Sequence, residues 1–183
     1  MQFNVAQLLK EPTGGTRKYE IDETLDDLDP ELVIQEPITG KIKFTKIPQG
    51  ILMVGKLRTL LEMNCSRCLE PFDLPVTIKL EEQFRPLLDL QTGAVLPQEE
   101  DADEATLIDQ KNIVDLSEVV RQALLLVLPA LPVCREDCLG LCAQCGQNLN
   151  EGTCDCPQEI VDPRWEALRT LLDSPEEDSE EES

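Results

Sequence analysis

The sequence predicts an α+β fold: an antiparallel β meander or small barrel packed with one long helix, then a Cys-rich zinc-ribbon-like module and a C-terminal helix. Two observations support this prediction. Apolar and polar residues alternate along residues 41–44 and 72–81, and residues 51–64 are rich in apolar residues, as expected for successive strands. Six of the eight cysteines then fall within residues 134–156. Successive short strands favour a meander or a small barrel.

Composition divides the chain into four predicted parts. Residues 1–90 are expected to form the antiparallel β domain, with an acidic loop at 20–30 and with Cys65 and Cys68 at the end of a β-hairpin. Residues 91–112 are predicted to be an acidic linker, because they combine acids with Gly and Pro. The part from 113 to 172 holds the helix, the Cys-rich module and the C-terminal helix. The last residues, 173–183, are predicted to be a disordered acidic tail.

Two helices are predicted in the third part. Asp115 is a good N-cap, Glu118 follows three residues later, and apolar residues recur at helical spacing until Pro129. Leu126 widens the apolar surface, which predicts a helix buried between layers. The second helix begins with Asp at the N-cap and Pro163 at the first helical position.

The negative charge is concentrated in a few segments. The chain has 37 acids against 16 Lys and Arg, which gives a net charge of −21. Residues 20–36, 99–109 and 173–183 carry eight, six and seven acids and no Lys or Arg. Such runs are usually solvated loops or tails, although they can also dock on a basic protein. The remainder of the chain is close to neutral.

The absence of histidine limits the function. It removes the Ser-His-Asp and Cys-His catalytic arrangements and every His-containing zinc site. We therefore expect no enzyme, no catalytic residue and no small-molecule substrate. No apolar run reaches 18 residues, so no membrane span is expected.

The cysteines predict structural zinc held by sulfur alone. A Cys-x-x-Cys pair followed by Gly146 can wrap one side of a tetrahedral ion, and sites of four cysteines are usually closed and structural. The favoured ligand set is Cys142, Cys145, Cys154 and Cys156. Cys134 and Cys138 either replace one of these pairs or join Cys65 and Cys68 in a second site. The prediction is one or two zinc ions.

Two other uses of the cysteines are less favoured. A disulfide scaffold is typical of small secreted domains, but residues 1–15 lack a secretory segment and the chain is long and acidic. A thioredoxin-like pair would open a helix after a strand, and neither Cys-x-x-Cys pair is followed by a helical pattern.

Five basic residues are expected on the solvent face of the strands, where they are candidates for contact with RNA phosphates. They are Lys41, Lys43, Lys56, Arg58 and Lys79. The favoured interpretation is a solvated outer face with scattered acids such as Glu62 and Glu81. Aromatic residues are too few to support base stacking.

The chain resembles the YceD family, which is associated with accumulation of large-subunit ribosomal RNA. The resemblance rests on Cys65-Ser-Arg-Cys68-Leu-Glu-Pro71, on Leu124 to Leu131 with Pro132-Val133-Cys134, and on Cys138-Leu-Gly-Leu-Cys142-Ala-Gln-Cys145-Gly-Gln-Asn-Leu-Asn150. It continues through Cys154-Asp-Cys156 and Asp162-Pro163-Arg164-Trp165-Glu-Ala-Leu168, so that it covers residues 50–172.

The resemblance implies a non-enzymatic role in the synthesis, processing or stability of large-subunit ribosomal RNA. The implied partners are a ribosomal protein or a ribosome-assembly factor, with large-subunit rRNA as an auxiliary contact. The implied location is the bacterial cytoplasm, with the chloroplast stroma as the alternative. The competing function from the residues themselves is a thiol redox or metal-handling protein.

Overall fold

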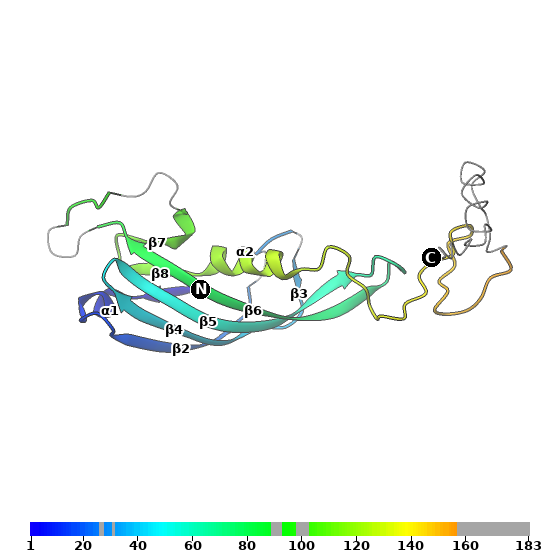
Figure 1. Ribbon diagram of the computed structural model, residues 1–183, viewed down its shortest axis with the longest axis horizontal. Coiled ribbons are helices and arrows are strands. Elements are labelled where there is room, and N and C mark those ends of the chain that lie inside the picture. Colours follow the sequence, from blue (N-terminus) through cyan, green and yellow to red (C-terminus); the bar gives the residue numbers. More distant parts are fainter. Residues whose placement is uncertain (26–27, 31, 89–92, 98–102, 157–183) are drawn as a thin grey trace, which may run out of the picture. The chain divides into compact units, whose positions relative to one another are not determined.

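The protein forms two compact units, Met1–Cys138 and Leu139–Ser183. The computed structural model describes residues 1–25, 28–30, 32–88, 93–97 and 103–156 (Figure 1). The predicted C-terminal helix at 162–172 and the acidic tail at 173–183 lie outside these residues. Within the described part, no helix is both long enough and apolar enough to cross a membrane.

The first unit contains all the regular elements of the described chain. In chain order they are β1 (Gln2–Asn4), α1 (Ala6–Lys10), β2 (Thr16–Glu23), β3 (Val33–Ile34), β4 (Ile38–Ile47), β5 (Gly50–Asn64), β6 (Pro71–Pro86), the 3₁₀ turn η1 (Glu104–Thr106), β7 (Leu107–Ile108), β8 (Ile113–Asp115) and α2 (Ser117–Val127). This content is mostly β-sheet with few helices, in broad agreement with the predicted α+β class.

The main sheet has the order β2-β4-β5-β6-β7, with β3 also paired to β5. Strands β4, β5 and β6 form the predicted antiparallel meander, and β7 adds to β6 in parallel. Among the described strands the path is open, so the sheet is a meander rather than a closed barrel. Within the part of the chain that the structure describes, strand β6 has a partner on its β7 side only at Arg85 and Pro86. Pro75, which has no N–H to donate, is therefore tolerated within it.

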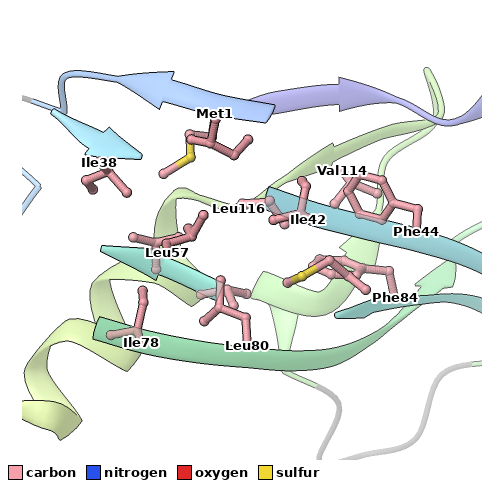
Figure 2. Close-up of a cluster of buried hydrophobic side chains, with 14 of the residues drawn as sticks. Met1, Ile38, Ile42, Phe44, Leu57, Ile78, Leu80, Phe84, Val114 and Leu116 are labelled. Carbon is pink, nitrogen blue, oxygen red and sulfur yellow. The ribbon is translucent and has the colours of Figure 1, made fainter. Parts of the chain in front are cut away.

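Side-chain alternation places one face of this sheet in the core. Ile42 and Phe44 of β4, Leu57 of β5, and Ile78 and Leu80 of β6 are buried, whereas their sequence neighbours point outward. These side chains converge from the three strands onto one cluster (Figure 2). Helix α2 and the ribbon of β1 and β8 contribute to the same core, through Leu116 and Val114 among others.

Close backbone packing at Gly40 shapes the centre of the sheet. A Cβ atom at Gly40 would lie 2.2 Å from the carbonyl oxygen of Lys56 on the neighbouring strand. A Cβ atom at Gly55 would lie 2.6 Å from a methyl group of Ile42. Glycine is thus needed at these two positions, where the paired strands β4 and β5 leave no room for a Cβ atom.

Helix α2 agrees with the predicted helix in position but not in every detail. It has 11 residues, its N-cap is Leu116, and Asp115 instead accepts a hydrogen bond of 2.9 Å from the amide of Ser117. Val120 and Leu124 are buried against the sheet, but Leu126 is 86% exposed. The prediction of a helix buried between two layers is therefore wrong, because α2 packs against β6 on one side while Leu126 is exposed.

Two segments that were expected to be irregular are folded. Residues 20–23, predicted as loop, belong to β2. They pair with β4 in antiparallel register, from Glu20 opposite Lys41 to Glu23 opposite Ile38. In the predicted linker 91–112, residues 104–108 form η1 and β7, and Ile108 is fully buried. The division between the two units falls after Cys138, within the segment that composition had assigned to one Cys-rich part.

Candidate metal centres and a basic sheet face

The first group of thiols, here called the hairpin cluster, joins the end of the β5–β6 hairpin to the segment after α2. It consists of Cys65, Cys68, Cys134 and Cys138, whose sulfur atoms all lie within 4.8 Å of one another. The Sγ atoms of Cys65 and Cys138 are 3.8 Å apart, as are those of Cys68 and Cys134. Three of the four residues are buried and Cys134 is half-buried. The cluster therefore lies within the first unit and is shielded from water.

The turn between β5 and β6 has the backbone hydrogen bonds of a metal-binding knuckle. The amide of Cys65 donates to the carbonyl of Glu70, and the amide of Leu69 donates back to the carbonyl of Cys65, each at 2.9 Å. The amide of Arg67 donates to Cys65 Sγ at 3.4 Å. Leu69 has a positive φ of 62°, which the tight turn requires. The turn thus directs both sulfurs to the same side.

Arg67 connects the two halves of the hairpin cluster. Its Nη1 donates hydrogen bonds to the carbonyls of Glu136 at 3.1 Å and Cys138 at 3.0 Å. The amide of Ser66 also donates to the carbonyl of Pro132 at 2.7 Å. The segment after α2 is therefore fixed to the hairpin by hydrogen bonds as well as by the arrangement of its thiols.

The second group, here called the turn cluster, repeats this geometry in the second unit. It consists of Cys142, Cys145, Cys154 and Cys156, again with sulfur atoms within 4.8 Å of one another. The amide of Cys142 donates to the carbonyl of Gln147 at 2.8 Å, that of Gly146 to the carbonyl of Cys142 at 2.9 Å, and that of Gln144 to Cys142 Sγ at 3.5 Å. Gly146, with φ of 74°, occupies the position that Leu69 occupies in the first knuckle.

The two clusters differ in their exposure to water. Cys145 is exposed and the other three residues of the turn cluster are only half-buried. The local chain is held by hydrogen bonds within residues 139–153, among them that from the amide of Leu139 to Asn150 Oδ1 at 2.9 Å. The turn cluster is therefore the more accessible of the two.

In each cluster one thiol ionises easily while another resists ionisation. The backbone amide of Cys68 lowers the pKa of Cys65 to about 6, and burial raises the pKa of Cys134 to about 12. The backbone amide of Cys145 lowers the pKa of Cys142 to about 6, whereas the side chain of Cys145 and burial raise the pKa of Cys156 to about 12. Four thiolates crowded together need a cation among them to be ionised at neutral pH.

These arrangements fit a tetrahedral metal ion. A zinc–sulfur distance of about 2.3 Å and tetrahedral angles give a sulfur–sulfur separation of about 3.8 Å. Two of the separations in the hairpin cluster, Cys65–Cys138 and Cys68–Cys134, have this value. Four sulfur donors without histidine or carboxylate suit zinc, which accepts four thiolates without a preferred distortion. All eight cysteines are free thiols in the structure, with no disulfide among them.

The strands place all five predicted basic residues on the outward face of the sheet. Lys41, Lys56 and Lys79 lie directly opposite one another on β4, β5 and β6 and are here called the lysine row. Arg58 and Lys43 lie on either side of this row, at alternate positions of the same strands. The acids named with them, Glu62 and Glu81, are exposed on the same face.

A negatively charged hollow lies at another place on the first unit. It has a volume of about 530 Å³ and lies beside the N-terminal end of α2. Its lining includes Glu104, Asp109, Asp115 and Glu118, with Arg121 as the one basic residue among the described residues that line it. Arg121 is itself paired with Glu118 at 2.7 Å and Asp29 at 2.8 Å.

Sequence reasoning did not find three residues of these sites. Arg67 lies between the cysteines of a recognised motif, but its bonds to residues 136 and 138 depend on the fold. Leu69 follows a Cys-x-x-Cys pair where glycine is usual, and this departure was the available signal. Lys18, on β2, lies opposite Lys43 and so belongs to the basic face. It was missed because residues 16–19 were not recognised as part of a strand.

Fold and sites together define a class: a β-rich protein with one packed helix and two groups of four cysteines arranged to hold a metal ion. Residues 53–172 match the family described as large ribosomal RNA subunit accumulation protein YceD. The chain belongs to this family, as its cysteine-bearing motifs indicate.

Individual relatives come from mycobacteria and plants. An uncharacterized protein of Mycobacterium tuberculosis (strain H37Rv) is 32% identical over 138 residues, which are 75% of this chain and 63% of the relative. The large ribosomal RNA subunit accumulation protein YCED homolog 1, chloroplastic, of Arabidopsis thaliana is 24% identical over 156 residues, covering 74% and 48% of the two chains. The chain thus spans less than two thirds of the length of these relatives. No solved structure matches it significantly.

Proposed function

We propose that this protein is a non-enzymatic factor that supports the synthesis, processing or stability of large-subunit ribosomal RNA. The observation that carries the proposal is the family match over residues 53–172, together with plant relatives whose names state a role in accumulation of the large ribosomal RNA subunit. The chain acts by binding, since it has no histidine and its distinctive residues are thiols grouped in fours.

In this proposal each cysteine cluster holds one structural zinc ion. The hairpin cluster joins the β5–β6 hairpin to the segment after α2, and the turn cluster folds residues 142–156 into a zinc-ribbon-like module. Zinc supplies the positive charge that lets four neighbouring thiols ionise, while the knuckle amides and Arg67 orient the ligands. A closed site of four sulfurs leaves no position for a reactive water molecule, which agrees with a structural role.

The metal content tests this assignment directly. Protein purified under reducing conditions should contain two zinc ions per chain. A Cys65→Ser, Cys138→Ser variant should retain one, and so should a Cys142→Ser, Cys154→Ser variant. Wild-type protein without zinc would contradict the assignment, and one ion lost equally in both variants would show a single site that shares ligands from both groups.

The partners we propose are a basic ribosomal protein or an assembly factor, and large-subunit rRNA itself. The acidic hollow beside α2 offers complementary charge to a basic protein segment. The basic sheet face offers complementary charge to RNA. The names of the relatives suggest a bacterial cytoplasm or a chloroplast stroma as the place where these partners meet the protein.

Depletion of the protein from its own cells tests the function. The expected result is loss of large-subunit rRNA and of free large subunits in sucrose gradients, with small subunits unaffected. Re-expression of the wild-type chain should restore both. Unchanged large-subunit rRNA after depletion would overturn the proposal.

A thiol redox or metal-handling role is the second candidate, and the low pKa of Cys65 and of Cys142 favours it. Rapid, reversible formation of a Cys65–Cys68 disulfide in the metal-loaded protein would support it. The burial of Cys65 and Cys68 favours the structural role instead, because an oxidant or a thiol partner has to reach the sulfur atoms.

A further inference from the structure

The lysine row is an unusual use of a sheet. Lys56 of β5 lies directly opposite Lys41 of β4 on one side and Lys79 of β6 on the other. Like charges in directly opposed positions destabilise a sheet. Three of the 16 basic residues of a chain with net charge −21 are nevertheless placed in one line across three strands. Local stability does not account for this arrangement.

Most of these charges are not neutralised within the protein. Of the three lysines in the row, only Lys41 forms an ion pair with a described residue, Glu20 Oε1 at 3.0 Å, and both side chains of that pair are 80% exposed. Exposed pairs of this kind contribute little and exchange readily. Lys56 and Lys79 have no carboxylate within ion-pairing distance in the part of the chain that the structure describes. Their charges are available to a ligand.

A shallow trough lies beside two residues of the lysine row, Lys41 and Lys56. It has a volume of about 650 Å³, and its charged lining consists of the basic residues Lys41, Lys56 and Arg58 and the acidic residues Glu20 and Asp22. The hydroxyls of Thr39 and Thr77 also border it, and Arg58 Nε lies 3.4 Å from Thr39 Oγ1. Cationic groups next to hydroxyl donors are typical of sites that receive phosphate oxygens.

The same face lacks aromatic side chains on which bases could stack. No outward position of the described strands β2, β4, β5 and β6 carries an aromatic residue, because Tyr19, Phe44, Phe72 and Phe84 lie at positions of the opposite alternation. Binding of single-stranded RNA generally combines positive charge with aromatic stacking. Double-helical RNA is instead recognised through its shape, phosphates and 2′-hydroxyls.

We propose that the outward face around Lys41, Lys56, Lys79 and Arg58 binds the phosphate backbone of double-helical RNA. This inference rests on the proposed function and deepens it, since it assigns the RNA contact to one face and one class of RNA. The lysine row spans three strands and contacts phosphates, while Arg58 and the two threonine hydroxyls donate hydrogen bonds beside it. Binding is expected to be independent of sequence, because contacts to phosphates carry no sequence information.

The test compares two variants that change net charge equally. Zinc-loaded full-length protein is titrated into a fluorescent RNA duplex of 20 base pairs at several salt concentrations, and anisotropy is recorded. Lys56→Gln, Lys79→Gln removes two charges from the row. Lys10→Gln, Lys111→Gln removes two exposed charges elsewhere and is the matched control. The same titrations use an unstructured single strand of equal length.

The expected result is that wild-type protein and control bind the duplex equally and bind it more tightly than the single strand. The row variant should bind the duplex about tenfold or more weakly at low salt, and its salt dependence should be lower by about two counterions. Absence of duplex binding, preference for the single strand, or an equal loss in both variants would each overturn the inference.

A cellular arm separates this inference from the proposed function. If the row variant restores large-subunit rRNA in depleted cells as well as wild-type protein does, the RNA-binding face is wrong and the proposed function stands. If wild-type protein itself restores nothing, the proposed function fails. If the row variant fails in cells although it binds duplex RNA normally in vitro, the row contacts a protein and the inference is overturned.

Discussion

Leu69 has a backbone conformation that is unfavourable for a residue with a side chain. It is 65% exposed and has φ of 62°, at the position where the second knuckle carries Gly146. Left-handed backbone costs a residue with a Cβ atom about 1–2 kcal/mol, whereas glycine adopts it freely. The knuckle imposes this conformation because Cys65 and Cys68 have to point the same way.

Leu69→Gly should therefore stabilise the zinc-loaded protein, by about 0.5–1 kcal/mol after the greater flexibility of glycine in the unfolded chain is subtracted. Guanidinium unfolding followed by circular dichroism measures the change. Leu69→Ala is the control, since it removes the same apolar surface but keeps the strained conformation. Equal stability of the Gly and Ala variants would show that backbone strain is absent.

Glu118 provides a pH-dependent contribution to stability. Hydrogen bonds from Arg121, at 2.9 and 2.7 Å, and from Gln122 lower the pKa of Glu118 to about 2. A carboxyl whose pKa falls on folding stabilises the protein above its unfolded pKa of about 4.3 and loses this effect as the pH falls toward 2. The side chain is 45% exposed, so water reduces the contribution to below about 1 kcal/mol.

Glu118→Gln should consequently be less stable than wild type at pH 7 and at pH 5, and the difference should shrink at pH 3.5. Thermal unfolding of both proteins at the three pH values measures this. The metal clusters are the same in both proteins, so their own response to acid largely cancels. A difference that stays constant with pH would exclude the carboxylate as its source.

At the scale of elements, the close packing between the paired strands β4 and β5 determines which substitutions of glycine the sheet tolerates. A Cβ atom at Gly40 meets the backbone carbonyl of Lys56 at 2.2 Å, whereas one at Gly55 meets a movable methyl group of Ile42 at 2.6 Å. Backbone in a central strand pair moves only if its ladder hydrogen bonds are distorted. A side chain can change rotamer at lower cost.

Gly40→Ala is thus expected to destabilise the first unit by about 3 kcal/mol and Gly55→Ala by about 1 kcal/mol. Urea unfolding of the two variants, followed by far-UV circular dichroism, gives the comparison. If the two substitutions cost the same, the close approach at Gly40 relaxes without distorting the sheet.

The sequence predicted those elements that have a strong local pattern. Alternation identified β6, because Ile78 and Leu80 face the core while charged neighbours face solvent. The apolar content of residues 51–64 identified β5. Residues 20–23 were missed because Ile21 is the one buried residue among three acids, and their strand depends on pairing with β4. Strand β7 has two residues, which are too few for any period.

The grouping of the thiols could not be read from spacing alone. Cys134 and Cys138 are near the later cysteines in sequence, yet the structure places them beside Cys65 and Cys68. The reason is that β6 runs away from the hairpin end and α2, packed against β6, runs back toward it, so that the segment after α2 returns to the hairpin (Figure 1). The spacing of cysteines along the chain predicts which two belong to one turn, whereas the pairing of two distant segments depends on the whole fold.

At the scale of the molecule, the two clusters should differ in what they stabilise. The hairpin cluster lies within Met1–Cys138, and the turn cluster lies within the second unit. If each cluster holds the zinc ion that we propose, loss of the ion from the first cluster should remove a link between β5–β6 and the segment after α2, whereas loss from the second should affect local turns.

Cys65→Ser should lower the melting temperature of the first unit by about 10 °C, which corresponds to about 3–4 kcal/mol. Cys154→Ser should leave that transition unchanged and increase hydrogen exchange within residues 142–156. Differential scanning calorimetry and exchange mass spectrometry measure the two effects. A strong chelator should reproduce both changes, and added zinc should reverse them. Equal melting temperatures for wild type and Cys65→Ser would remove the stabilising role from the hairpin cluster.

The return of residues 134–138 to the hairpin has a consequence for biosynthesis. A nascent chain reaches its fourth hairpin-cluster sulfur, Cys138, only after β6 and α2 have left the ribosome. Shorter translation products offer two or three thiols, which hold an ion far less firmly than four. If the cluster binds the zinc ion that we propose, capture of the ion should therefore mark a complete first unit, and an arrested chain should stay open to proteases.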